Sequence, residues 1–159
     1  FMGQFLVLDS KKRRGGITVC ITSHGGCAGA GFAIHDIIKA AKNQVTTEAW
    51  GAAESIAALI FQAGSRRIMA PSARLLLHDV QTESSSSTGS RGVQAHADDI
   101  KALEELYFRI MAERAGIEPE QVAKWCHAIT AFSAREAVRA GLADEVMAVK
   151  GVAHARVRK

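Results

Sequence analysis

At 159 residues the chain is long enough for one domain with a hydrophobic core, and its 48% apolar and 23% charged residues are typical of a globular protein. No apolar run approaches the roughly 20 residues of a bilayer-crossing helix, and the opening FMGQFLVLDS lacks the basic leader of a secretory signal, so we expect a cytoplasmic protein. The net charge is +4, and the basic residues cluster at KKRR (Lys11 to Arg14) and in the tail AHARVRK without interleaved aromatics, which favours solvated loops over a nucleic-acid site.

The first half of the chain is predicted to alternate helices and strands. Runs of β-branched residues indicate strands, apolar residues three or four positions apart indicate helices, and Gly64 is the expected C-cap of the last helix. In chain order, the expected elements are a short packed helix (1–8), a buried strand (17–22), a helix (31–42), a strand (45–50) and an apolar helix (55–64).

The second half continues this alternation. Pro71 separates two short strands, the polar low-complexity segment QTESSSSTGSRG follows, and a long amphipathic helix begins near Val93. Ser133 and Gly141 are start and stop signals of a later helix. The expected elements are strands at 66–71 and 73–78, helices from Val93, at 118–125 and at 133–141, and a closing strand at 143–149. Such alternation predicts an α/β fold with a largely parallel sheet, in a single domain over residues 1–159.

The stretch WGAAESIAAL places Ser55 just before the apolar helix of the first half. A hydroxyl in the first turn of a helix lies near unpaired backbone N–H groups and the positive end of the helix dipole. Those N–H groups can stabilise an oxyanion when the hydroxyl attacks a carbonyl, so Ser55 is a candidate nucleophile. Serine is also a favoured N-cap, which is the structural alternative.

His78 ends the apolar strand ARLLLH and is a candidate general base. This role requires the imidazole to come within hydrogen-bond distance, about 2.6–3.2 Å, of the Ser55 hydroxyl. Both residues lie at the ends of expected elements, where open sheets present their sites. A plain rim residue is the alternative for His78, and His24 is a competing base for which a turn role is the alternative.

Gly25 and Gly26 follow the first expected strand. A Gly-Gly pair lets backbone N–H groups point outward, as in an oxyanion or phosphate cradle. Neither GxxxxGK[ST] nor GxGxxG is present, which disfavours a phosphate loop, and Ser55 lacks the flanking glycines of GxSxG, which disfavours an α/β-hydrolase. Cys27 is expected to be a small packed thiol rather than a nucleophile.

Four segments of the chain, taken in order, resemble the proteolytic subunit of the Clp protease and its relatives. ITSHGGCAGAGFAIHDII is similar to the family's strand, glycine loop and following helix, and GAAESIAALIFQAG is similar to its nucleophile segment. RRIMAPSARLLLH resembles the segment that leads to the catalytic histidine, and FSAREAVRAGLADEV resembles the closing motif. The resemblance covers nearly the whole chain and implies a crotonase-like ββα spiral with a protruding handle helix from about Val93.

The resemblance also implies a hydrolase of the serine endopeptidase class. Ser55 would form the acyl-enzyme, His78 would be its general base, and the backbone N–H groups of Gly26 and Ile56 would form the oxyanion hole. Such chemistry needs no metal and no organic cofactor. The substrate would be an unfolded polypeptide or a peptide, the chain would self-associate into homo-oligomeric rings, and an ATP-driven unfoldase would be its partner. We expect neither a nucleic acid nor a membrane as a partner.

The third triad member is not identified from the sequence. The family's catalytic aspartate falls on or beside Ile129, where no acid is present. An aspartate there fixes the tautomer of the imidazole, and its loss can cost about four orders of magnitude in rate. Glu54 and Asp79 are the nearest acids, but each neighbours a candidate catalytic residue, so we expect their side chains to point elsewhere. Asp144 matches a different family position and is expected to be structural.

Further departures from the family leave two alternatives open. The chain begins where the family has already formed an N-terminal strand and axial hairpin, so these docking elements are expected to be absent. The segment after His78 is longer than in the family and lacks proline. One alternative, motivated by the missing acid, is a ring subunit that is catalytically weak or inactive. The other is a crotonase-type acyl-CoA enzyme, which would use a carboxylate such as that of Glu54.

Overall fold

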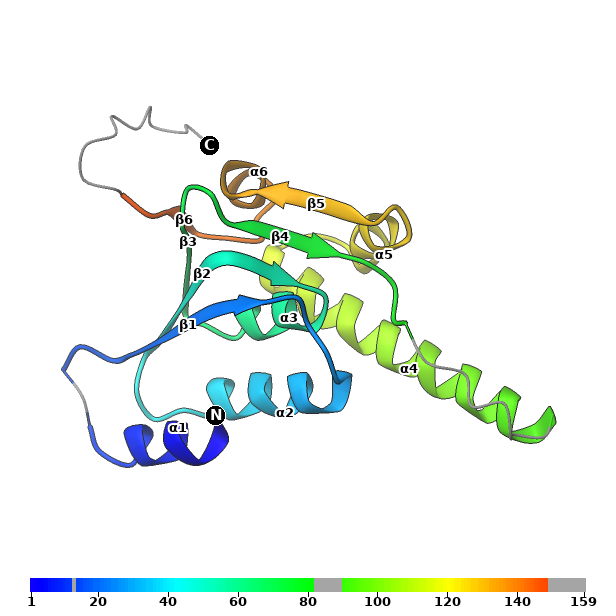
Figure 1. The fold of residues 1–159 in the computed structure, drawn as a ribbon, viewed down its shortest axis with the longest axis horizontal. Helices are drawn as coiled ribbons and strands as arrows, with labels where there is room; N and C mark the ends of the chain where they lie inside the picture. Colours follow the sequence, from blue (N-terminus) through cyan, green and yellow to red (C-terminus); the bar gives the residue numbers. More distant parts are fainter. Residues whose placement is uncertain (13, 82–89, 149–159) are drawn as a thin grey trace.

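The structure is a computed structural model that describes residues 1–12, 14–81 and 90–148 (Figure 1). The helices are α1 (Met2–Asp9), α2 (Ala28–Lys39), α3 (Ile56–Gln62), α4 (Ser90–Ala115), α5 (Pro119–His127) and α6 (Ala134–Arg139). The strands are β1 (Ile17–Ser23), β2 (Val45–Glu54), β3 (Arg66–Met69), β4 (Arg74–Leu77), β5 (Thr130–Ser133) and β6 (Glu145–Val146).

The long strand β2 is the centre of the sheet, which has six strands in the described residues. β1 runs parallel to β2 along one edge, while β3 pairs with residues 46–49 and β4 with residues 52–54 along the other. β6 pairs parallel with β3, and β5 pairs antiparallel with β4. The carboxyl ends of β2 and β4 therefore lie side by side, at the kind of edge where α/β proteins place their sites.

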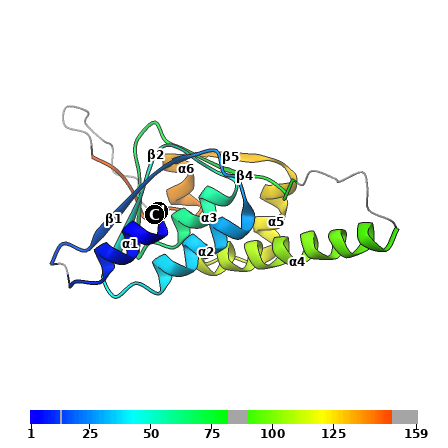
Figure 2. The same ribbon diagram turned by 60° about the horizontal axis from the view of Figure 1, so that its bottom comes forward.

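The helices pack on one face of the curved sheet, and α4 extends beyond the sheet (Figure 2). The two parts of α4 differ in burial. Val93 is 60% exposed, whereas Tyr107, Met111 and Ala112 are buried against the rest of the chain. The largest fully buried side chains of the core are Phe61, Leu59, Met69, Leu75, Leu77, Met111, Leu142, Gln62, Val122, Thr47 and Cys126. Helix α4 thus protrudes from the rest of the chain in its first part and packs in the core in its last part.

The C-cap expected at Gly64 is wrong by one residue. α3 ends at Gln62, and its C-cap is Ala63 in a right-handed helical conformation. Gly64 is instead required by packing, because a Cβ at this position would lie 2.3 Å from the Thr47 hydroxyl oxygen. That hydroxyl donates a hydrogen bond to the Phe61 carbonyl at 2.7 Å, so β2 and the end of α3 are in direct contact here.

The expected strands are present, but β2 continues to Glu54 rather than ending at Trp50, and further differences lie near the C-terminus. β5 was not expected, and β6 covers Glu145–Val146 rather than the whole of 143–149. The four residues of β5 are too few for an alternation of buried and exposed positions to be recognised, and their pairing with β4 is long-range. Most of the polar low-complexity segment, residues 82–89, lies outside the described residues.

Candidate active site

Ser55 occupies a strained turn between β2 and α3. Its φ of 56° and ψ of −130° lie outside the regions that residues with a side chain normally adopt. The Ser55 N–H donates to the Leu76 carbonyl at 2.8 Å, and the Ser55 carbonyl accepts from the Ala58 N–H at 2.9 Å. Such a conformation costs about 1–3 kcal/mol and persists only where the surrounding structure fixes it. A serine on a strained strand-to-helix turn is the geometry by which hydrolases expose a nucleophile.

The Ser55 side chain does not cap the helix that follows it. Ser55 is at the N-cap position of α3, but its hydroxyl makes no capping hydrogen bond. The structural alternative for this serine is therefore not supported. The hydroxyl is left for the cavity that Ser55 lines.

One cavity of about 430 Å³ brings the expected site residues together, since Ser55, His78, Gly26 and Ile56 all line it. The strand register explains why: Glu54 of β2 pairs with Leu76 of β4, so the residues after these two strands leave the sheet at the same edge. The rest of the lining consists of His24, Cys27, Ala28, Val80, Gln81, Leu103, Glu104, Tyr107 and Phe108. The cavity thus lies between the glycine loop, the segment after β4 and helix α4.

The two candidate oxyanion donors, Gly26 and Ile56, line the same cavity as Ser55. Gly25 and Gly26 adopt φ values of 105° and 141°, and the Gly25 N–H donates to the Ser23 hydroxyl at 3.1 Å. Ile56 is the first residue of α3, so its N–H has no partner within the helix. Gly26 and Ile56 line the same cavity as Ser55, where an oxyanion formed on Ser55 would need donors.

The hydrogen bond made by His78 sets its tautomer. The Nδ1 atom lies 2.5 Å from the main-chain oxygen of Asp79. A carbonyl oxygen can only accept, so Nδ1 carries the proton and Nε2 of the neutral ring carries a lone pair. A general base for a serine hydroxyl needs such a lone pair. In the described residues, no hydrogen bond joins the His78 ring to the Ser55 hydroxyl, a bond that often forms only when substrate binds.

The nearby acids point elsewhere, as expected. Glu54 Oε2 lies 2.7 Å from His24 Nδ1, and Asp79 Oδ1 lies 2.7 Å from His127 Nδ1. No carboxylate of the described residues is hydrogen-bonded to the His78 ring. Ile129, at the position expected for the family aspartate, is 62% exposed and has a φ of 49°.

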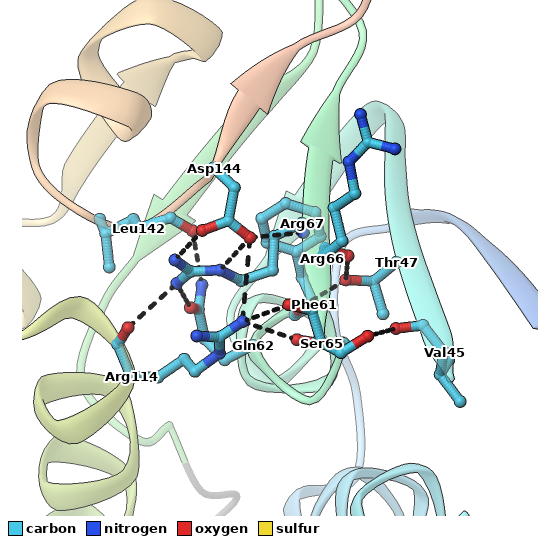
Figure 3. Close-up of polar contacts among 11 residues, drawn as sticks. Val45, Thr47, Phe61, Gln62, Ser65, Arg66, Arg67, Arg114, Leu142 and Asp144 are labelled. Atoms are coloured by element: carbon cyan, nitrogen blue, oxygen red, sulfur yellow. Dashed lines mark hydrogen bonds and ion pairs between the residues drawn. The ribbon is translucent and has the colours of Figure 1, made fainter. Parts of the chain in front are cut away.

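Asp144 belongs to a polar network with the buried residues Arg67 and Gln62 at the other end of α3 (Figure 3). Its carboxylate accepts three hydrogen bonds from Arg67: Oδ1 from Nη2 at 2.6 Å, and Oδ2 from Nε at 3.2 Å and from the main-chain N–H at 2.7 Å. Arg67 also donates to Gln62 Oε1 at 2.5 Å, and Gln62 donates to the Leu142 carbonyl at 2.9 Å. Partial burial opposes ionisation of Asp144, but the hydrogen bonds from Arg67 outweigh it and lower the pKa. These contacts fit a structural role.

Two residues of α4, Tyr107 and Glu104, also contact the site. From the sequence, Tyr107 was placed only on an apolar stripe, and Glu104 was not singled out. The Tyr107 hydroxyl donates to the Ser55 carbonyl at 3.4 Å, and Glu104 Oε1 accepts from the Val80 N–H at 3.2 Å. Burial raises the pKa of Tyr107 well above its usual value, so its phenol stays protonated as a donor. The helical spacing that placed Tyr107 on the apolar stripe was the signal for its burial, but it did not indicate the cavity.

The match to known families decides the assignment. The Clp protease family matches over residues 1–150. The chain belongs to this family. The resemblance and the fold class expected from the sequence are thereby confirmed, and the expectation of a serine endopeptidase is confirmed at the level of the family.

Individual relatives agree with this assignment. The ATP-dependent Clp protease proteolytic subunit of Chlorella vulgaris is 31% identical over 147 residues, which are 91% of this chain and 72% of that protein. Subunit 3 of the same protease from Streptomyces coelicolor is 30% identical over 146 residues, 91% of this chain and 66% of the relative. A solved structure of a ClpP1 mutant from Listeria monocytogenes superimposes with a TM-score of 0.81 at 27% identity, covering 94% of this chain and 82% of that one.

No helix in the described ranges is both long and apolar enough to span a bilayer.

Proposed function

We propose that residues 1–159 form one catalytic domain, a Clp-type serine endopeptidase that hydrolyses peptide bonds through an acyl-enzyme on Ser55. The observation that carries the proposal is the strained turn at Ser55. Its hydroxyl makes no cap, and it shares one cavity with the His78 ring. Strain of this kind is retained where exposure of a reactive group requires it.

In the proposed reaction His78 Nε2 takes the proton of the Ser55 hydroxyl as its oxygen attacks the substrate carbonyl. The tetrahedral oxyanion accepts hydrogen bonds from the N–H groups of Gly26 and Ile56. The His78 imidazolium then gives its proton to the leaving amine, and the acyl-enzyme remains on Ser55. Water, deprotonated by the same imidazole, attacks the ester, and the serine hydroxyl is regenerated with release of the acid. No step needs a metal or an organic cofactor.

The same family assignment supports proposals about assembly. The relatives are named as proteolytic subunits of an ATP-dependent protease, which favours self-association into rings that enclose Ser55 and receive unfolded chains from an ATP-driven unfoldase. Residues 93–99 of α4 are exposed and available for contact with a second ring, as Val93 illustrates. A cytoplasmic location is proposed from the sequence.

Labelling with a fluorophosphonate and cleavage of an unfolded protein test the proposal. The wild-type chain should be modified at Ser55, and Ser55→Ala should lose both labelling and cleavage, the latter by about 10⁴-fold or more. His78→Gln should retain the fold and lose both in the same way. Ser65→Ala is the matched control, because its hydroxyl, just beyond α3, only donates to the Val45 carbonyl at 2.9 Å.

The alternatives predict different results in the same experiment. An inactive ring subunit would leave Ser55 unlabelled although the fold and the ring are intact. A crotonase-type enzyme would turn over a thioester in the Ser55→Ala variant. The second is disfavoured because Glu54, the carboxylate it would use, contacts His24 and is not among the residues that line the cavity.

A further inference from the structure

Asp79 lies between two imidazoles that come from different parts of the chain. Its main-chain oxygen accepts from His78 Nδ1 at 2.5 Å, and its carboxylate oxygen Oδ1 lies 2.7 Å from Nδ1 of His127, the last residue of α5. A carboxylate accepts, so His127 Nδ1 donates in this contact. The main-chain and side-chain oxygens of one residue are thus both used by histidines.

We propose that Asp79 and His127 are positioning residues that replace the triad aspartate. The Asp79 carbonyl orients the His78 ring and holds its proton on Nδ1, and His127 fixes the conformation in which Asp79 can do so. The proposal rests on the proposed function, in which His78 is the general base.

Contacts from α4 explain how this short segment is held. The chain has no regular secondary structure at Asp79 and Val80, so side chains from the neighbouring helices must fix it. Glu104 of α4 accepts from the Val80 N–H at 3.2 Å. The ring of Phe108, one turn further along α4, meets the His127 ring edge to face at 6.2 Å and 89°. The segment after His78 is therefore held by a side chain of α4 at Val80 and by a side chain of α5 at Asp79.

Because the contact between His127 and Asp79 is partly exposed, its effect on His78 can be separated from its effect on stability. The side chains of His127 and Asp79 are 62% and 45% exposed, and ion pairs in such surroundings contribute little to the free energy of unfolding. Loss of the contact should therefore change the orientation of His78 without lowering the melting temperature. The acceptor for His78 Nδ1 is the main-chain oxygen of Asp79. Replacement of the Asp79 carboxylate by an amide therefore leaves this acceptor in place.

Histidine tautomers read by ¹⁵N NMR test the proposal directly. The chain is labelled with ¹⁵N-histidine and measured at about pH 8.5, where an ordinary imidazole is neutral, and His78 is assigned by comparison with His78→Gln. Wild-type His78 should be the Nδ1–H tautomer. In His127→Ala the ratio of the two tautomers should move toward that of free histidine by roughly threefold or more. His127→Asn should restore the wild-type ratio, because its amide nitrogen can take the place of Nδ1.

Two further variants complete the design. Glu145→Gln breaks the Arg66–Glu145 ion pair, of similar exposure at 58% and 43%, and should leave the His78 tautomer unchanged. Asp79→Asn should keep the Nδ1–H tautomer, because the main-chain oxygen that accepts from His78 is retained. His127→Ala should lower kcat by roughly two- to tenfold with KM unchanged, and His127→Asn should recover it.

Either of two results would overturn the proposal. One is an unchanged tautomer ratio for His78 in His127→Ala. The other is a fall in kcat approaching 10⁴-fold in Asp79→Asn, which would make the carboxylate itself the third triad member. The NMR measurement needs no turnover, so it decides the proposal even if Ser55 proves unreactive toward the fluorophosphonate and the proposed function fails.

Discussion

A methyl group on Gly25 would lie 2.7 Å from the Cβ of Ser55 and 3.2 Å from its hydroxyl oxygen. The same Cβ would lie 3.1 Å from the Glu54 carbonyl oxygen, and the φ of 105° is one that other residues rarely adopt. The glycine loop after β1 and the turn after β2 are therefore packed closer than a side chain permits. Because Gly26 directly follows Gly25, we expect this contact to position the Gly26 N–H.

Gly25→Ala should displace the glycine loop and lower kcat by about 10²-fold, the effect of losing one oxyanion donor. Gly29→Ala, near the start of α2, is the matched control. A Cβ there meets no atom within 4 Å, so kcat should be unchanged and the free energy of unfolding should rise by about 0.5–1 kcal/mol. Kinetics with a peptide substrate and urea unfolding measure both effects. Wild-type kcat in a folded Gly25→Ala chain would show that the contact does not place the donor.

Gly31 of α2 and Ile56 of α3 make a second close contact. A Cβ on Gly31 would lie 2.0 Å from the Ile56 Cγ1 atom. Gly31→Ala should therefore destabilise the chain by about 1–3 kcal/mol, and Ile56→Ala by about 2–5 kcal/mol through loss of buried volume. The double variant should be more stable than the sum of the two effects by at least about 1 kcal/mol, because the methyl group then fills the space. Simple additivity in urea unfolding would contradict this packing.

The fold was predictable wherever local pattern decides structure. β1 was expected at 17–22 and occupies Ile17–Ser23, because β-branched residues fit a pleated strand whatever its partners. β5 was missed because the four residues of Thr130–Ser133 acquire their conformation from antiparallel pairing with β4, more than fifty residues earlier. No local sequence pattern indicates that one edge of β2 pairs with both β3 and β4.

The candidate site was predictable in part for the same reason. Ser55 and His78 were found because each follows a recognisable element and because the surrounding segments resemble a family. The contact between Asp79 and His127 joins residues 48 positions apart, and the contact between His24 and Glu54 joins residues 30 apart. Such side-chain contacts follow from tertiary placement, so no spacing along the chain could indicate them.

Ser133 should stabilise α6 through its capping box. Its hydroxyl accepts from the Glu136 N–H at 3.4 Å, while the Glu136 carboxylate accepts from the Ser133 N–H at 2.8 Å. Ser133→Ala should lower the free energy of unfolding by about 1 kcal/mol, whereas Glu136→Gln keeps an acceptor and should cost less. Ser10→Ala removes an exposed hydroxyl that donates to the Val7 carbonyl and should change stability by less than about 0.5 kcal/mol. Equal effects of Ser133→Ala and Ser10→Ala in urea unfolding would refute the cap.

Asp144 should make stability depend on pH in the acid range. Its pKa in the folded chain is lowered by hydrogen bonds from Arg67, below the ordinary value of about 3.9. The unfolded chain therefore takes up the proton first, so the contribution of ionised Asp144 is complete above about pH 5 and is lost as pH falls through the folded pKa. Asp144→Asn should cost roughly 2–3 kcal/mol at neutral pH, less than a fully buried pair because Asp144 is 37% exposed.

The difference between the wild-type chain and Asp144→Asn should shrink as the pH falls below about 4, because protonation then removes the charge that the variant lacks. Backbone N–H groups lower the pKa of Asp9, and hydrogen bonds from Ser133 lower the pKa of Glu136. Both residues are present in the two chains, so their contributions to the pH dependence cancel in this difference. Glu145→Gln, which removes an exposed ion pair, should cost less than about 1 kcal/mol at neutral pH. Urea unfolding from about pH 7 to pH 3 measures all three chains. A constant difference between the wild-type chain and Asp144→Asn across this range would mean that the Arg67 contact stabilises through geometry and not through the charge of Asp144.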